Sequence, residues 1–295
     1  MTKTSFKALA TLCRLSTEKA MDPLVTIDLA AAPARDKPWM SENLVSLHGT
    51  PYFDALDEGQ RLKLSQLEFS LFCSISSSGE REVIANVAKL MLKRRFEPYR
   101  RYIFHFLREE NNHIYMFSEF CHLHGRFFPI LYPYAQGEMW KDDALADLMT
   151  FVHVFVFEEL GQGLNEVMMR DPGLPELVQA MNRYHVLDEA RHISFGRHLI
   201  AEVAPAILAA QPEEERAALR RHVARYVASR HIDYHSLPIY RMVGVPDAAK
   251  AREELISARG VEYLARSPRA GKRVRSMLDF LKDMGLLDEQ PVAMS

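Results

Sequence analysis

Two short glutamate–histidine motifs, each in a segment with helical periodicity, constrain the fold of this chain more than any other feature. They are the Glu-x-x-His motifs at 110–113 and 189–192, and a glutamate in an apolar helical setting precedes each: Glu80 by 30 residues and Glu158 by 31. Residues three apart share one helix face. A helix of about 14 residues, a turn and a returning helix bring the chain back to the same height. The spacing therefore predicts two antiparallel helical hairpins, each with a glutamate level with its motif.

Four helices that each carry acidic or imidazole ligands on an inward face are typical of a two-metal carboxylate site inside a helical bundle. We therefore predict an all-α, ferritin-like bundle with a di-metal site in its core. His185 adds a further candidate, because it lies four residues before Glu189 and seven before His192 on one continuous face. The predicted metal ligands are Glu80, Glu110, His113, Glu158, His185, Glu189 and His192.

The two single glutamates each have a neighbour that could take their place. Glu158 is followed by Glu159, and spacing favours Glu158, whose face carries Phe151, Val154 and Phe155. Glu80 is favoured over Glu82 because Glu82 shares its face with asparagine and two lysines, which is typical of a solvated stripe.

A third Glu-x-x-His motif, at 119–122, is assigned to structure or surface. Glu119 follows Glu110 by nine residues, which turns it to the opposite face of the helix. An acid also stands just before each ligand glutamate, Glu109 and Asp188. Histidines that bind metals usually donate their second ring N–H to a carboxylate. We predict that each of these acids holds the histidine of the other hairpin, with Arg191 neutralising one of them.

The chain divides by composition into an irregular N-terminal strap, residues 1–55, and a single helical domain over 56–295, with the ligand helices at about 79–201. Four prolines, at 23, 33, 38 and 51, interrupt the strap. Helices are expected at about 58–77, 79–95, 98–124, 143–170, 174–201, 213–235 and 247–283. The first two of these are compatible with one continuous helix.

Bulk composition excludes several classes of protein. The formal net charge of −2 and the lack of a basic stripe argue against a nucleic-acid partner. No apolar stretch approaches the roughly 20 residues that span a bilayer. Three unpaired cysteines and a short, interrupted apolar run near the N-terminus favour a reducing compartment over secretion, and we expect a cytoplasmic protein.

The seven ligand positions, with His185 as the distinguishing one, resemble the AurF-like p-aminobenzoate N-oxygenase family of non-haem di-iron oxygenases. The resemblance covers about residues 60–200. It implies two iron ions (manganese is compatible with the same ligands), a homodimer, and oxidation of an amine to a hydroxylamine and onward toward a nitro group. Dioxygen would be the oxidant and an external donor would supply electrons.

Three alternatives remain open at this point. The same cluster could hydroxylate or desaturate a C–H bond. A ferritin-like protein that binds or stores iron is the second, and a metal-free helical interaction protein is the third; metal analysis of the purified protein separates it from the rest.

Overall fold

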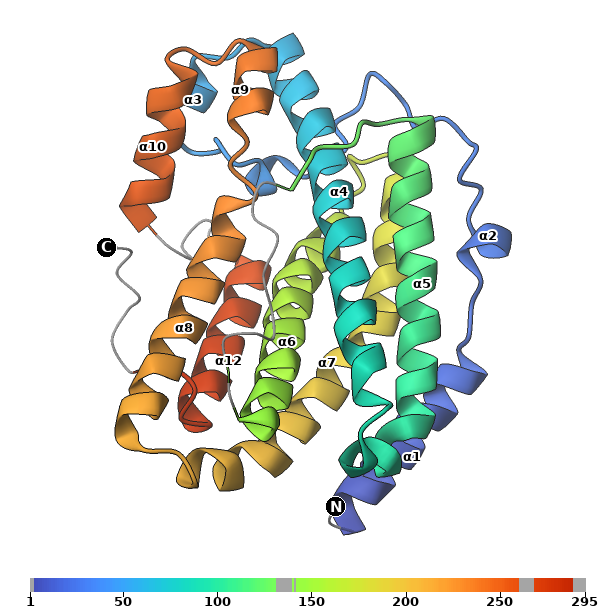
Figure 1. The fold of residues 1–295 in the computed structure, drawn as a ribbon. Helices are drawn as coiled ribbons and strands as arrows, with labels where there is room; N and C mark the ends of the chain where they lie inside the picture. The colour runs from blue at the N-terminus through green and yellow to red at the C-terminus, as the bar shows by residue number, and fades with distance from the viewer. Residues whose placement is uncertain (1–2, 131–139, 141, 260–267, 289–295) are drawn as a thin grey trace.

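The chain forms an all-α structure, seen in a computed structural model that describes residues 3–130, 140, 142–259 and 268–288 (Figure 1). These residues contain no β-strand, which confirms the predicted fold class. Four long helices build the bundle: α4 (Glu58–Leu90), α5 (Arg100–Leu123), α6 (Asp143–Met168) and α7 (Glu176–Ala209). The shorter elements are α1 (Lys3–Glu18), α2 (Pro23–Thr26), η1 (Glu42–Leu44), α3 (Pro51–Asp54), η2 (Arg94–Tyr99), α8 (Glu213–Ile232), α9 (Leu237–Val243), α10 (Ala248–Arg259) and α12 (Pro268–Asp283).

The long helices pair as the two predicted hairpins, α4 with α5 and α6 with α7. Local chemistry sets where they begin. Asp57 caps α4 in a capping box with Gln60, and the side chain of Asp142 accepts the backbone N–H of Leu145 at the start of α6. α4 runs without a break through residues 77–79, so the two helices expected there are one.

The expectation of an irregular strap over residues 1–55 is wrong for its first third, because α1 occupies Lys3–Glu18. Leu9, Leu12, Cys13 and Ser16 are buried and recur at helical spacing. This stripe lies where α1 packs against α5 and α7. α1 is therefore part of the wall of the bundle (Figure 1).

The single helix expected over 247–283 is also wrong. α10 packs against α9, whereas α12 packs along α6, so the two belong to different parts of the molecule (Figure 1). α9 was not predicted; it ends at Gly244, whose φ of 84° is the left-handed conformation that terminates helices. Residues 260–267 lie outside the described part of the chain. No helix in the described residues combines the length and apolarity that a membrane crossing requires.

Candidate metal centre

The seven residues predicted as metal ligands come together in the interior of the bundle. α4 contributes one of them, α5 two, α6 one and α7 three. None exposes more than 3% of its surface. The residues are Glu80, Glu110, His113, Glu158, His185, Glu189 and His192.

The two Glu-x-x-His motifs face each other across the bundle. Glu110, His113, Glu189 and His192 each offer one ligand atom, and these atoms lie within 4.8 Å of one another. Nδ1 of His192 is 2.7 Å from Oε1 of Glu110, and Nδ1 of His113 is 3.0 Å from Oε1 of Glu189. Both histidines thus turn the same ring nitrogen toward the carboxylates of the other hairpin.

A second group adjoins the first and shares His113 with it. Ligand atoms of Glu80, His113 and His185 also lie within 4.8 Å of one another. Nε2 of His185 is 3.2 Å from Oε1 of Glu80 and 3.2 Å from Oε1 of Glu189. Because Glu189 approaches histidines of both groups, the two clusters are suited to hold two neighbouring metal ions.

Glu158 borders these groups without belonging to either. It is 2% exposed on α6. Burial raises the pKa of its carboxyl well above the usual range, and the charges of Glu189 and Glu110 raise it further. A carboxylate held against two others in an apolar interior calls for a cation nearby.

Several polar atoms of the cluster lack the hydrogen bonds that buried groups normally make. Six of the seven residues have a side-chain oxygen or nitrogen that is buried without such a bond: Glu80, Glu110, His113, Glu158, His185 and Glu189. Leaving a buried polar atom unsatisfied costs roughly 1–3 kcal/mol, and more when it is charged. The donor set, carboxylate oxygens with imidazole nitrogens, fits iron or manganese.

The pKa values of the cluster residues reflect their burial and the close approach of carboxylates to histidines. Burial raises the pKa of Glu80 despite its contact with His185. Burial opposes a charge on His113 and His192, yet the surrounding carboxylates raise the pKa of both well above the usual range. In contrast, the histidines around Glu189 lower the pKa of its carboxyl well below the usual range, although burial opposes this.

The two acids that precede the ligand glutamates hold the far sides of the imidazoles, across the hairpins as predicted. Oε2 of Glu109 lies 2.9 Å from Nε2 of His192, and Oδ2 of Asp188 lies 3.2 Å from Nε2 of His113. Such contacts fix the orientation and tautomer of a histidine so that its other nitrogen can bind a metal.

Arg191 joins these two acids instead of neutralising only one. Its Nη2 lies 3.0 Å from Glu109 and also donates to Asp188. Its Nε donates to Oγ of Ser16 on α1, at 3.0 Å. The N-terminal helix is thereby linked to the metal centre through one buried guanidinium.

Asn165 is a site residue that sequence reasoning missed. Its Nδ2 lies 2.7 Å from Nδ1 of His185 and 2.8 Å from the carbonyl oxygen of Gly161. Asn165 thus holds the ring whose Nε2 faces Glu80. The available signal was its position seven residues after Glu158, on the same helix face.

The neighbouring carboxylates that competed for ligand positions point elsewhere. Glu159 is buried away from the cluster, where it pairs with Arg197 at 2.7 Å and with Arg273 on α12 at 2.5 Å. Glu82 is half-buried and Glu119 is half-buried, and neither belongs to the two ligand groups in the described residues.

The fold and the cluster together define a ferritin-like helical bundle with a carboxylate–histidine site suited to two metal ions. The chain belongs to the p-aminobenzoate N-oxygenase AurF family, whose sequence profile it matches over residues 2–282. That family makes it an oxidoreductase of the oxidase or oxygenase class.

Solved structures provide a more distant comparison. A mutant of an R2-like ligand-binding oxidase with an aerobically reconstituted Mn/Fe cofactor is 15% identical, with a TM-score of 0.43, and the match covers 90% of this chain and 92% of that chain. A second mutant of such an oxidase, anaerobically reconstituted with Mn/Fe, gives the same identity and TM-score, with 90% and 93% coverage. No curated protein sequence matched the chain.

Proposed function

We propose that the seven residues bind two iron ions and that the protein uses dioxygen to N-oxygenate an amine, giving a hydroxylamine or a nitro product. The observation that carries the metal assignment is the convergence of buried carboxylate and imidazole atoms without hydrogen bonds. Membership of the N-oxygenase family supports the amine as substrate. Manganese is compatible with the same donors.

A bound di-iron centre would supply the activation of dioxygen, and the protein would supply the environment for it. Glu80, Glu110, Glu158 and Glu189 would balance the metal charge. Phe106 packs on the His192 ring, with centroids 4.3 Å apart, and Phe117 packs on the His185 ring at 4.9 Å. These rings exclude water from the imidazoles and hold them in place.

The remaining features of the reaction extend the same proposal. Turnover would consume electrons from an external donor, and the active form would be a homodimer, as the family resemblance implies. The cysteine usage and the N-terminal sequence support a cytoplasmic location. We further propose that residues 56–295 act as one domain, with α1 packed on its side.

The deciding experiment is a turnover assay. Protein loaded anaerobically with ferrous iron is exposed to dioxygen with a chemical reductant and a panel of arylamines, and products are identified by mass spectrometry. We expect products that carry one or two added oxygen atoms on nitrogen, none with Glu110→Ala, and unchanged yields with Glu119→Ala. Products hydroxylated or desaturated at carbon would show that the protein catalyses the C–H reaction in place of N-oxygenation. Iron accumulation in large cage assemblies, without turnover, would favour storage.

A further inference from the structure

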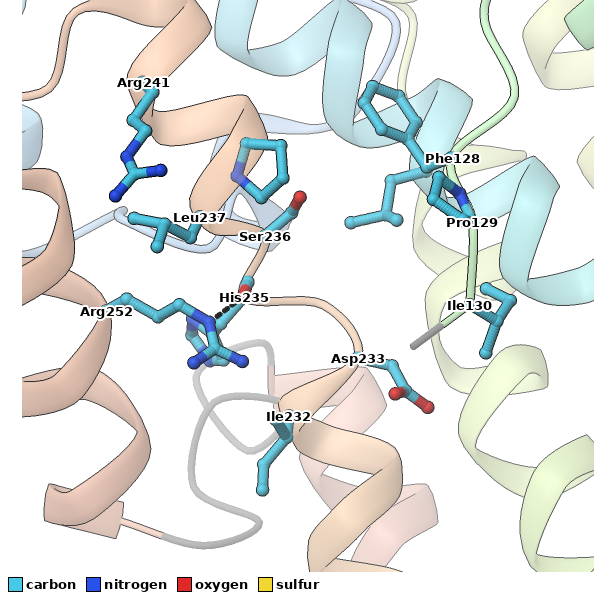
Figure 2. A pocket seen from close by; sticks show the side chains of 12 residues that line it. Phe128, Pro129, Ile130, Ile232, Asp233, His235, Ser236, Leu237, Arg241 and Arg252 are labelled. Carbon is cyan, nitrogen blue, oxygen red and sulfur yellow. Dashed lines mark hydrogen bonds between the residues drawn. The ribbon is translucent and has the colours of Figure 1, made fainter. Parts of the chain in front are cut away.

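A cavity of about 360 Å³ lies between α4, the segment that follows α5, and helices α8, α9 and α10, and none of its lining residues is a candidate metal ligand (Figure 2). Its volume falls within the range of roughly 300–1,000 Å³ that is usual for small-molecule sites. Leu71 on α4 lines it, nine residues before Glu80. Nine residues correspond to roughly 13 Å along a helix and half a turn around it. The cavity is therefore on the opposite side of α4 from the metal ligands.

The walls of this cavity differ in chemistry. Phe128, Pro129 and Ile130 lie along one side, and Arg241 and Arg252 lie on the other (Figure 2). This arrangement suits a ligand with an apolar body and an anionic end.

The two arginines leave most of their donors available. Nε of Arg252 donates to the carbonyl oxygen of His235, at 2.7 Å, which anchors α10 to the segment after α8. Within the described residues, Nη1 and Nη2 of Arg252 make no hydrogen bond or ion pair. The guanidinium of Arg241 makes none there either. A guanidinium fork matches a carboxylate or a phosphate, so the anionic end has two candidates.

Asp233 favours a carboxylate over a phosphate as the anionic end of the ligand. Its carboxylate also lines the cavity and is balanced by Arg230, at 3.1 Å. A second carboxylate near the ligand disfavours a doubly charged phosphate more than a singly charged carboxylate. We propose that this cavity is a second binding site, separate from the metal centre, for a small organic carboxylate with an apolar body.

Calorimetric titration of the metal-loaded protein tests the site with four probes: octanoate, 4-phenylbutyrate, the uncharged octanamide and inorganic phosphate. We expect both carboxylates to bind saturably, one per chain, and octanamide and phosphate to bind at least about ten-fold more weakly, because a hydrogen bond to a charged group is lost or opposed. Equal binding of octanamide, tighter binding of phosphate, or no binding of either carboxylate would overturn the proposal.

Variants locate the site. Arg241→Gln removes an exposed charge and should weaken octanoate binding by roughly ten-fold, whereas Arg221→Gln, an exposed arginine on α8 outside the cavity, should leave it unchanged. Leu237→Trp should also weaken octanoate binding, because the larger side chain occupies part of the cavity. If octanoate bound both cavity variants with wild-type affinity, its site would lie elsewhere, for example at the metal centre. That result would refute the proposed site. This outcome is independent of whether the protein oxidises amines.

Discussion

Glu109 and Glu110 contact the two ring nitrogens of one imidazole, that of His192. Oε2 of Glu109 is 2.9 Å from Nε2 of His192, and Oε1 of Glu110 is 2.7 Å from Nδ1 of the same ring. Consecutive residues on α5 thereby play different parts with respect to a histidine of α7. Glu110 faces the position proposed for the metal ions, and Glu109 orients the His192 ring so that its Nδ1 faces the same position.

Removing the outer carboxylate should weaken metal binding without abolishing it. We expect Glu109→Ala to lower metal affinity by roughly 10- to 100-fold, because the His192 ring loses its orienting partner. Competition with a chromophoric chelator measures the change. Glu109→Gln, which keeps one acceptor oxygen, should recover part of the affinity. Wild-type affinity in the alanine variant would contradict this role.

Removing an inner carboxylate should have the larger effect. Glu189 contacts His113, His185 and His192. Glu189→Ala should therefore leave the protein with little or no bound iron, as measured by elemental analysis after expression with added iron. Glu119→Ala, on the face of α5 opposite Glu110, is the control and should retain full loading. Retained iron in Glu189→Ala, or lost iron in the control, would show the helix faces to be assigned wrongly.

The adjacent acids Glu158 and Glu159 should give opposite phenotypes. Glu158→Ala should lose metal. Glu159→Ala should keep metal but lower the free energy of unfolding by about 2 kcal/mol, because the ion pairs of Glu159 with Arg197 on α7 and with Arg273 on α12 disappear. Metal analysis and urea unfolding of both variants separate the two roles. Metal loss confined to Glu159→Ala would exchange the assignments.

His185 should tune the centre more than retain it. His185→Ala removes a single nitrogen donor, so we expect a reduced but detectable iron content and an altered optical spectrum of the loaded protein. Asn165→Leu, which removes only the partner of the His185 ring, should shift the spectrum in the same direction to a smaller extent. Spectra identical to the wild type in both variants would argue that His185 is not a ligand.

Glu68 lies outside the metal centre, and we expect it to make the free energy of unfolding depend on pH. Burial raises its pKa from 4.5 to about 8, although hydrogen bonds from Ser46 lower it. The folded pKa exceeds the unfolded one, so the stability contributed by the neutral carboxyl is complete below about pH 4.5 and is lost as pH rises through about 8.

Glu68→Gln keeps the side chain neutral and should flatten this dependence. Urea unfolding at about pH 5 and about pH 9 should show the wild type losing more stability than the variant, by up to a few kcal/mol at about 1.4 kcal/mol per pH unit. Parallel pH profiles would mean that Glu68 is already ionised in the folded protein.

The sequence was sufficient to predict the bundle and the convergence of the seven candidate residues, because both depend on spacing along helices. Glu80 and Glu110 can be matched by counting residues to a turn, and the apolar neighbours of Glu158 show which acid faces inward. The crossed contacts of Glu109 and Asp188 follow from the same counting. Each of these inferences needs only helical geometry and a hairpin.

What the sequence could not supply depends on contacts between distant segments. The place of α1 in the structure comes from the packing of Leu9 and Leu12 where this helix meets α5 and α7. Neither the link from Ser16 to Arg191 nor the hydrogen bond from Asn165 to His185 is implied by periodicity. The division of 247–283 between α10 and α12 likewise reflects different packing partners.

The hydroxyl of Ser16 is the outermost link of a chain that passes through Arg191 to two carboxylates and from them to two imidazoles. A truncation that removes α1 would therefore take a buried partner away from Arg191, and with it part of the support for the carboxylates that orient His113 and His192.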